Sequence, residues 1–146
     1  MTLDANEILA REAVEAFYRA FEAKSVELLR KVVTPDWQYL PEPAGTAHGP
    51  DQMVPVFERL ATAIPDMKVE ILDLLVHGDR VGVRAEVSGT QTGELLGIDA
   101  SSKHLRFAIH SFHQLRGSLI EKTWHLEDWL SVFRQLGQLP KTLDRP

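Results

Sequence analysis

Near the end of the chain, two extended segments carry side chains that could exchange protons. Residues 105–115 and 119–130 are rich in apolar and branched residues and flank Arg116-Gly117-Ser118, a pattern that predicts a β-hairpin with a three-residue loop. In that register His110 lies opposite Trp124. Because strand side chains alternate between two faces, one face is expected to carry Ala108, His110, Phe112, Trp124, Leu126 and Asp128.

This expected wall combines an imidazole, an indole and a carboxylate. A carboxylate against aromatic rings is poorly solvated, which raises its pKa, and an imidazole already titrates near neutral pH. His110, Trp124 and Asp128 therefore predict acid–base chemistry in a pocket. Two alternatives stay open. His and Asp on strands are often rim or structural groups, and a four-residue loop would place His110 opposite His125.

The first half of the chain predicts the helices that must cover this wall. Apolar residues recur at helical spacing over residues 4–24, a second helix is expected over 25–33 and ends before Pro35, and a third spans 50–64. Residues 37–40 are typical of a short strand, and a loop rich in Pro and Gly follows it. We therefore expect three helices before the main strands.

A strand-like pattern begins after the third helix. Residues 67–76 and 80–90 are rich in branched side chains and are separated by Gly78-Asp79, which predicts a hairpin with a two-residue loop. That register puts Asp73 opposite Arg84. The two side chains are expected to form a cross-strand ion pair.

Together these elements predict a single α+β domain over residues 1–146, with a core at about 4–137 and a tail at 138–146. Residues 89–103 are expected to form a loop, and residues 131–136 a short last helix. Four long antiparallel strands after three helices indicate a curved sheet with the helices on one face. Such a sheet can enclose an apolar pocket.

Composition excludes several classes of function. A net charge of −5 disfavours nucleic acid as a partner, and a chain without Cys forms no disulfide and no thiolate metal site. His110 and His113 are three apart on a strand, so they face opposite sides and we expect no metal site there. The N-terminal segment lacks an apolar signal core, and no apolar run is long enough to cross a membrane, which predicts a cytoplasmic protein.

Several motifs resemble one family over most of the chain. Residues 107–137 read FAIHSFHQLRGSLIEKTWHLEDWLSVFRQLG, and residues 89–103 read GTQTGELLGIDASSK. Their order and spacing are similar to those of the SnoaL-like polyketide cyclases. By position, the resemblance implies that Asp128 is the acid–base residue, His110 its partner in the pocket and Trp124 an aromatic residue of the wall.

The resemblance also implies a fold and a reaction. The family fold is a cone of the nuclear-transport-factor type, also called a cystatin-like α+β barrel, in which three N-terminal helices and a curved sheet enclose a deep pocket. Its characterised members close the last ring of aromatic polyketides by an intramolecular aldol step, without a metal or an organic cofactor. That step needs a positioned base and hydrogen bonds to a developing enolate.

The sequence departs from the family pattern at two pocket-related positions. Gln91 stands where the family loop usually has His, which leaves hydrogen bonding but no proton transfer, and Lys122 stands where Glu is usual. Tyr18, Trp37, Met53 and Phe57 are expected either in the pocket or in the core, and His48 either at its mouth or in solvent. The residues predicted to contact a ligand are Trp124, Tyr18, Trp37, His48, Met53, Phe57, Gln91, Phe112 and His125.

Two functions follow as hypotheses. The first is an acid–base enzyme, without a cofactor, that acts on a small, mostly apolar carbonyl compound. The second is a non-catalytic protein that binds a small molecule in the same pocket, and an isomerase or epoxide hydrolase on this fold is a further alternative. The face of the sheet that carries the Asp73–Arg84 pair is expected to hold Val69, Ile71 and Leu75 and to form a homodimer.

Overall fold

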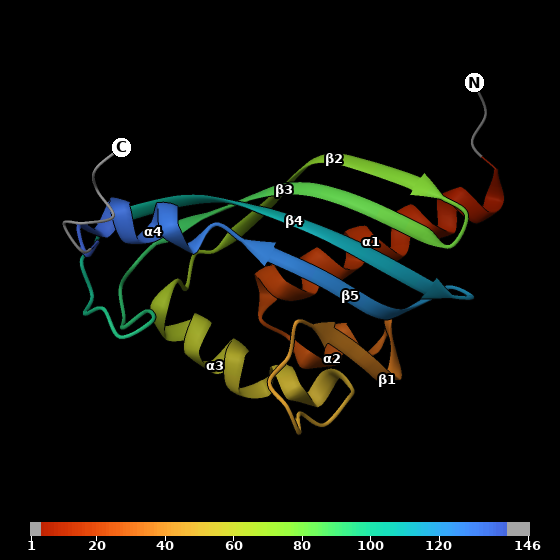
Figure 1. The fold of residues 1–146 in the computed structure, drawn as a ribbon, viewed down its shortest axis with the longest axis horizontal. Coiled ribbons are helices and arrows are strands. Elements are labelled where there is room, and N and C mark those ends of the chain that lie inside the picture. Colours follow the sequence, from red (N-terminus) through yellow and green to blue (C-terminus); the bar gives the residue numbers. More distant parts are fainter. Residues whose placement is uncertain (1–3, 140–146) are drawn as a thin grey trace.

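A five-stranded sheet curves over the helices of the first half of the chain in the computed structural model, which describes residues 4–139 (Figure 1). The helices α1 and α3 lie on the same side of this sheet, and α4 lies at one end of it (Figure 1). The predicted α+β class is therefore confirmed. Of the predicted tail, residues 140–146 lie outside the described residues.

Capping side chains fix where the first two helices begin. Asp4 accepts a hydrogen bond from a first-turn backbone amide at 2.7 Å, and Ser25 accepts one at 3.1 Å. Pro50 begins a 3₁₀ turn that leads into the third helix, at a position where its missing N–H costs nothing. The helical elements are α1 (Ala5–Ala23), α2 (Val26–Arg30), η1 (Pro50–Met53), α3 (Val54–Ala63) and α4 (Trp129–Leu136).

The sheet has the strand order β1-β5-β4-β3-β2, in which β1 is parallel to β5 and the other neighbours are antiparallel. Edge positions are thus taken by β1 and β2, and β5, β4 and β3 form the centre. The strands are β1 (Val33–Leu40), β2 (Lys68–His77), β3 (Arg80–Thr90), β4 (His104–Arg116) and β5 (Leu119–Glu127).

The strand β1 is longer than predicted. The second helix was expected to reach residue 33, but it ends at Arg30, and β1 already begins at Val33. Pro35 therefore lies inside a strand instead of ending a helix. An edge strand tolerates this residue because one side of its backbone needs no hydrogen-bond donor.

The first hairpin has the predicted two-residue turn. Asp73 pairs with Arg84, whose Nε donates to the Asp73 carboxylate at 2.7 Å, as expected. The register shifts between Ile71 and Asp73, so Val69 and Ile71 face the helices while Leu75 faces outward. The expectation that all three share the outer face was therefore wrong, because a β-bulge reverses the alternation.

The second hairpin is one residue tighter at its turn than predicted. Arg116 pairs with Leu119, and a register shift beyond them places Phe112 opposite Trp124 and His110 opposite Leu126. The expected pairing of His110 with Trp124 was wrong. The register differs by two residues, however, so each side chain keeps its predicted companions on its own face.

The core fills the space between the inner face of the sheet and the helices. Alternate residues of β3, from Val81 to Val87, point into it, and α1 packs Val14 and Phe17 against that face. Trp37 of β1 is completely buried among these side chains. The inner face is therefore defined by odd-numbered positions on both β3 and β4.

Candidate functional site

A cavity of about 280 Å³ lies between the inner face of the sheet, α1 and α3. Most of its wall is apolar or aromatic, with contributions from Phe17, Phe21, Met53, Met67, Ile109 and Trp129. The polar groups at its wall are those of Tyr18, Tyr39, Ser111, His125 and Glu127. An apolar cavity with a few convergent polar groups is the usual form of a small-molecule site.

His125 and Glu127 form the charged centre of this wall. They are two residues apart on β5, so they share one face, and His125 Nδ1 lies 2.7 Å from Glu127 Oε1. Both side chains are largely buried, and His125 Nε2 makes no hydrogen bond among the described residues. An imidazole with one nitrogen on a carboxylate and the other open to a cavity can take up a proton.

Tyr39 of β1 holds this pair in place. Its ring stacks on the His125 imidazole with 3.7 Å between centroids and an angle of 8° between the planes. Its hydroxyl donates to Glu127 Oε1 at 3.4 Å. Burial and the Glu127 carboxylate raise the pKa of Tyr39, so its hydroxyl remains a donor.

A second polar cluster is buried beneath the cavity wall. Tyr18 Oη lies 2.9 Å from His113 Nε2, and His113 Nδ1 lies 2.9 Å from Thr123 Oγ1. The Trp37 indole N–H donates to the same Thr123 oxygen at 3.2 Å. Burial lowers the pKa of His113 to about 3, so this imidazole is neutral at physiological pH.

An open groove adjoins the cavity. It has a volume of about 670 Å³ and lies between α3 and residues 94–97. Val56, Leu60 and Trp129 line both hollows, so these three side chains separate the groove from the cavity. The groove and the cavity are therefore neighbouring hollows with a shared wall.

The structure places the predicted catalytic wall outside this cavity. His110 is exposed on the outer face of the sheet, and Asp128 is exposed at the start of α4, where its carboxylate accepts a hydrogen bond from Ser131 N at 3.0 Å. Phe112 is 63% exposed, and Trp124 lies on the same outer face under the Arg80 guanidinium, 5.2 Å from its ring centroid. The grouping of His110, Phe112, Trp124 and Leu126 on one face was correct, but this face is not the one at the cavity, and Asp128 belongs to the cap of α4.

This correction has a physical reason in the neighbouring strand. The even-numbered residues of β3 include Arg80, Arg84 and Glu86, and they lie beside the even-numbered residues of β4 in the sheet. Three charged side chains mark that face as the solvated one. The outer face of β4 and β5 nevertheless carries the large apolar residues Phe112, Trp124 and Leu126, which hid the difference.

The other predicted ligand contacts divide into two groups. Tyr18, Met53 and His125 line the cavity. Trp37 and Phe57 are buried in the core, where Phe57 packs edge-on against Phe21. Trp37 and Phe57 therefore pack behind the residues that line the cavity.

Gln91 organises a loop instead of lining the cavity. It is completely buried, and its side-chain amide nitrogen donates to the carbonyls of Gly93, Ile98 and Asp99 at 3.0–3.1 Å. Its amide oxygen accepts a hydrogen bond from Ser101 Oγ at 2.6 Å. Gln91 therefore holds together the loop beside the groove.

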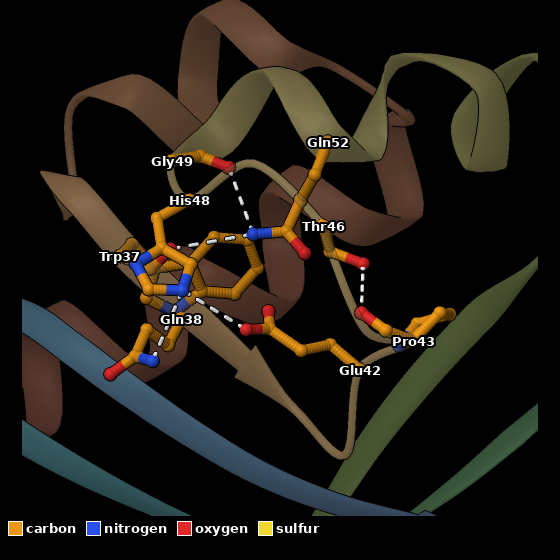
Figure 2. Close-up of polar contacts among 8 residues, drawn as sticks. All are labelled: Trp37, Gln38, Glu42, Pro43, Thr46, His48, Gly49 and Gln52. Atoms are coloured by element: carbon orange, nitrogen blue, oxygen red, sulfur yellow. Dashed lines mark hydrogen bonds and ion pairs between the residues drawn. The ribbon is translucent and has the colours of Figure 1, made fainter.

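His48 lies in the loop after β1, away from the cavity. Figure 2 shows its imidazole beside the Glu42 carboxylate and the Gln38 amide, with Nε2 at 3.1 Å and 3.2 Å from them. Gln52 donates to the carbonyls of Trp37 and Gly49 and so ties this loop to β1 (Figure 2). The prediction that His48 stands at the cavity mouth was wrong, and the alternative of a solvated loop residue holds.

Sequence reasoning missed the groups that give the cavity its chemistry. Glu127, Tyr39 and Ser111 were not predicted as site residues, and His125 was only a secondary candidate. The available signal was the alternation of His125 and Glu127 on the face that also carries Ser111. Tyr39 lies 88 residues before Glu127 in the sequence, so no local pattern predicts their contact.

Comparison with known proteins agrees with the fold. The SnoaL-like polyketide cyclase family matches residues 11–136 of the chain. TsrD from Streptomyces laurentii is 28% identical, with 94% of this chain and 100% of that chain covered and a TM-score of 0.82. No functionally curated protein matches the sequence.

Two further solved structures share the fold at lower identity. A SnoaL-like protein from Jannaschia sp. CCS1 is 20% identical over 96% of this chain and 99% of that chain, with a TM-score of 0.80. IdmH from Streptomyces antibioticus, a proposed polyketide cyclase, is 23% identical over 88% of this chain and 98% of that chain, with a TM-score of 0.76. The cone architecture is thus shared across distant sequences.

Two searches of residues 4–139 gave negative results. No helix in this range is long and apolar enough to cross a membrane. No three His, Asp or Glu side chains of the described range are grouped as metal ligands would be.

Proposed function

Since this chain belongs to the SnoaL-like polyketide cyclase family, we propose that it is an acid–base enzyme that acts on a small, mostly apolar carbonyl compound without a cofactor. The observation that carries this proposal is the 2.7 Å contact between His125 Nδ1 and Glu127 Oε1 at an otherwise apolar cavity wall. The reaction of this type is an intramolecular aldol ring closure.

In this reaction His125 is the base. Its Nε2 takes a proton from the carbon next to a substrate carbonyl, and the electron pair of that C–H bond moves into the enolate. The enolate carbon then attacks a second carbonyl of the same molecule and forms the new C–C bond. The imidazolium returns its proton to the resulting alkoxide, so no net proton is gained or lost.

Glu127 supports His125 in two ways. Its carboxylate accepts the Nδ1 hydrogen, which leaves Nε2 as the free base, and it stabilises the imidazolium that forms during the reaction. The Tyr39 ring stacked on His125 fixes the plane of the imidazole. The base is thus oriented before substrate binds, which reduces the entropy lost on the way to the transition state.

The size of the cavity restricts the substrate. Its volume of about 280 Å³ is at the lower end of ligand sites, which span roughly 300–1,000 Å³. One or two fused rings fit such a space, and a longer molecule would extend into the groove beyond Trp129. An apolar wall favours aromatic or alicyclic ketones over charged metabolites.

The test is exchange of the hydrogens next to the carbonyl of α-tetralone in D₂O, followed by NMR. We expect the protein to accelerate this exchange and the His125→Asn variant to lose at least about a hundredfold of the acceleration, since a positioned general base contributes roughly 10²–10⁴. His110→Asn, on the outer face, is the matched control and retains the full rate. Binding of α-tetralone with exchange that does not depend on His125 would contradict the enzyme proposal and favour the non-catalytic binding protein.

The outer face of the sheet supports a second proposal, that two copies of the chain associate there. Leu75, Phe112 and Leu126 are 72%, 63% and 73% exposed on this face. The Arg84–Asp73 pair lies beside them and supplies both signs of charge. A face with apolar centre and mixed charges is complementary to itself about a twofold axis, so the partner is a second copy.

A further inference from the structure

Four buried side chains are linked by hydrogen bonds that lead to the cavity: Trp37, Thr123, His113 and Tyr18. Trp37, at the end away from the cavity, sets the direction of these hydrogen bonds. An indole nitrogen only donates, so Trp37 must give its hydrogen to Thr123 Oγ1 at 3.2 Å. Both residues are completely buried, so water does not compete for these groups. The Thr123 oxygen is therefore an acceptor in this contact.

The Thr123 hydroxyl must then donate its own hydrogen elsewhere. His113 Nδ1, at 2.9 Å, is the acceptor within its reach among the described residues. A buried hydroxyl that leaves its hydrogen unpaired loses about 1–3 kcal/mol, so the hydrogen points to Nδ1. His113 Nδ1 is accordingly unprotonated.

That arrangement decides the tautomer of His113. A neutral imidazole with an unprotonated Nδ1 carries its hydrogen on Nε2. Burial lowers the pKa of His113 to about 3, so no second proton is present at neutral pH. Nε2 therefore donates to Tyr18 Oη, 2.9 Å away.

Tyr18 is left with its own O–H free, and that group lies at the cavity. Tyr18 and Ser111 both line the cavity, and the Ser111 side chain is near enough to donate a hydrogen bond to the Tyr18 oxygen, which leaves the Tyr18 hydrogen unused. Burial raises the pKa of Tyr18, which keeps the phenol protonated, and the Glu127 charge is near enough to raise it further. Tyr18 therefore shares one part of the cavity with the His125–Glu127 pair.

We propose that Tyr18 is a catalytic hydrogen-bond donor to the substrate carbonyl oxygen, and that Trp37, Thr123 and His113 are positioning residues that keep its hydrogen directed into the cavity. This role rests on the proposed function, because the oxygen becomes an enolate only when His125 removes a proton. A donor that itself accepts a hydrogen bond is strengthened by polarisation, and a donor aimed at a developing oxyanion lowers the barrier. The neutral chain achieves this without a buried charge.

The first arm of the test needs no ligand. In ¹⁵N NMR of the intact protein, we expect the His113 ring hydrogen on Nε2 and a nitrogen without hydrogen at Nδ1. The Thr123→Val variant, which has the same shape without the hydroxyl, should shift this tautomer equilibrium, and Thr123→Ser should restore it. A hydrogen on His113 Nδ1 in the unaltered protein would overturn the proposal.

The second arm measures the donor with 4-nitrophenolate as an enolate mimic. A hydrogen bond to a charged oxygen is worth roughly 1.5–3 kcal/mol, so Tyr18→Phe should weaken binding about 10- to 100-fold. Thr123→Val should weaken it by a smaller factor, and Thr123→Ser should retain it. The matched ligand 4-nitroanisole, which has no oxyanion, should bind all variants equally.

The outcomes separate this inference from the proposed function. Equal affinity of 4-nitrophenolate for the unaltered protein and for Tyr18→Phe overturns the donor role, whatever the exchange assay gives. If the unaltered protein shows no exchange that depends on His125 but still binds 4-nitrophenolate through Tyr18, the enzyme proposal is overturned. Tyr18 then remains a donor in a binding site. Preferential binding of 4-nitroanisole over 4-nitrophenolate by the unaltered protein also contradicts the donor.

Discussion

At the scale of single residues, two imidazoles on the inner face of one sheet have different surroundings and different tasks. His125 has a carboxylate on one side and the cavity on the other, so it can gain and lose a proton. His113 lies between two hydroxyl groups without a neighbouring charge, so burial dominates and the ring stays neutral. The two histidines therefore differ in their position relative to Glu127. His125 is the proposed base, and His113 is structural.

The neutral state of His113 predicts a pH dependence of stability. Its pKa falls from 6.5 to about 3 on folding, so between these values the unfolded chain binds a proton that the folded protein does not. The contribution of neutral His113 to the free energy of unfolding is complete above pH 6.5. It is lost as the pH falls toward 3, by up to about 1.4 kcal/mol per pH unit. Urea unfolding of His113→Asn should show a flatter pH profile than the unaltered protein. His110→Asn, its exposed counterpart, should keep the original slope, and identical slopes for all three proteins would contradict the assignment.

At the scale of elements, the loop between β3 and β4 forms one side of the groove beside the cavity. Gln91 holds its carbonyls together, and Gly93 brings its backbone against α3. A side chain at position 93 would place its Cβ 2.5 Å from the backbone oxygen of Thr62. Neither backbone can yield without moving the loop from the helix.

Substitution of Gly93 by Ala should therefore destabilise the protein. Overpacking of this kind costs roughly 1–3 kcal/mol in the free energy of unfolding, measured by urea denaturation. Gly82→Ala is the matched control, because its added methyl group meets only the Phe112 ring at 3.4 Å. Equal stability of the two variants would show that the loop moves freely relative to α3.

At the scale of the whole molecule, one face of the sheet borders the cavity and the other is the face of the proposed dimer contact. The inner face is covered by α1 and α3, whereas Phe112 and Leu126 remain open on the outer face. Association through the outer face leaves the groove beside α3 accessible, since the two lie on opposite sides of the sheet. The proposed dimer would therefore leave this groove uncovered.

The dimer proposal predicts a change of mass on a single substitution. Light scattering after gel filtration should give twice the chain mass for the unaltered protein and the chain mass for Phe112→Glu, because a buried unpaired charge is costly. Leu28→Glu, at an exposed apolar position on α2, should remain dimeric. A monomer for the unaltered protein would rule out the dimer.

Local patterns in the sequence were sufficient for most elements and for one side-chain pair. Helical spacing predicted α1 and α3, and the two-residue turn at Gly78-Asp79 predicted the Asp73–Arg84 pair, because its register depends only on adjacent residues. Alternation on β4 and β5 also sorted the side chains correctly into two faces, since the register error was two residues. The family resemblance was likewise readable from motif order and spacing.

Tertiary structure alone decided which face of the sheet encloses the cavity. The contacts that define the inner face join residues far apart in the chain, such as Tyr18 with His113 and Trp37 with Thr123. These partners come from α1 and from a parallel edge strand whose pairing no short pattern predicts. Both faces carry apolar, imidazole and hydroxyl or acidic groups, so side-chain type could not choose between them. Burial under α1 and α3 made the choice, and for this reason the proposed base is His125 at the cavity and not Asp128 at the start of α4.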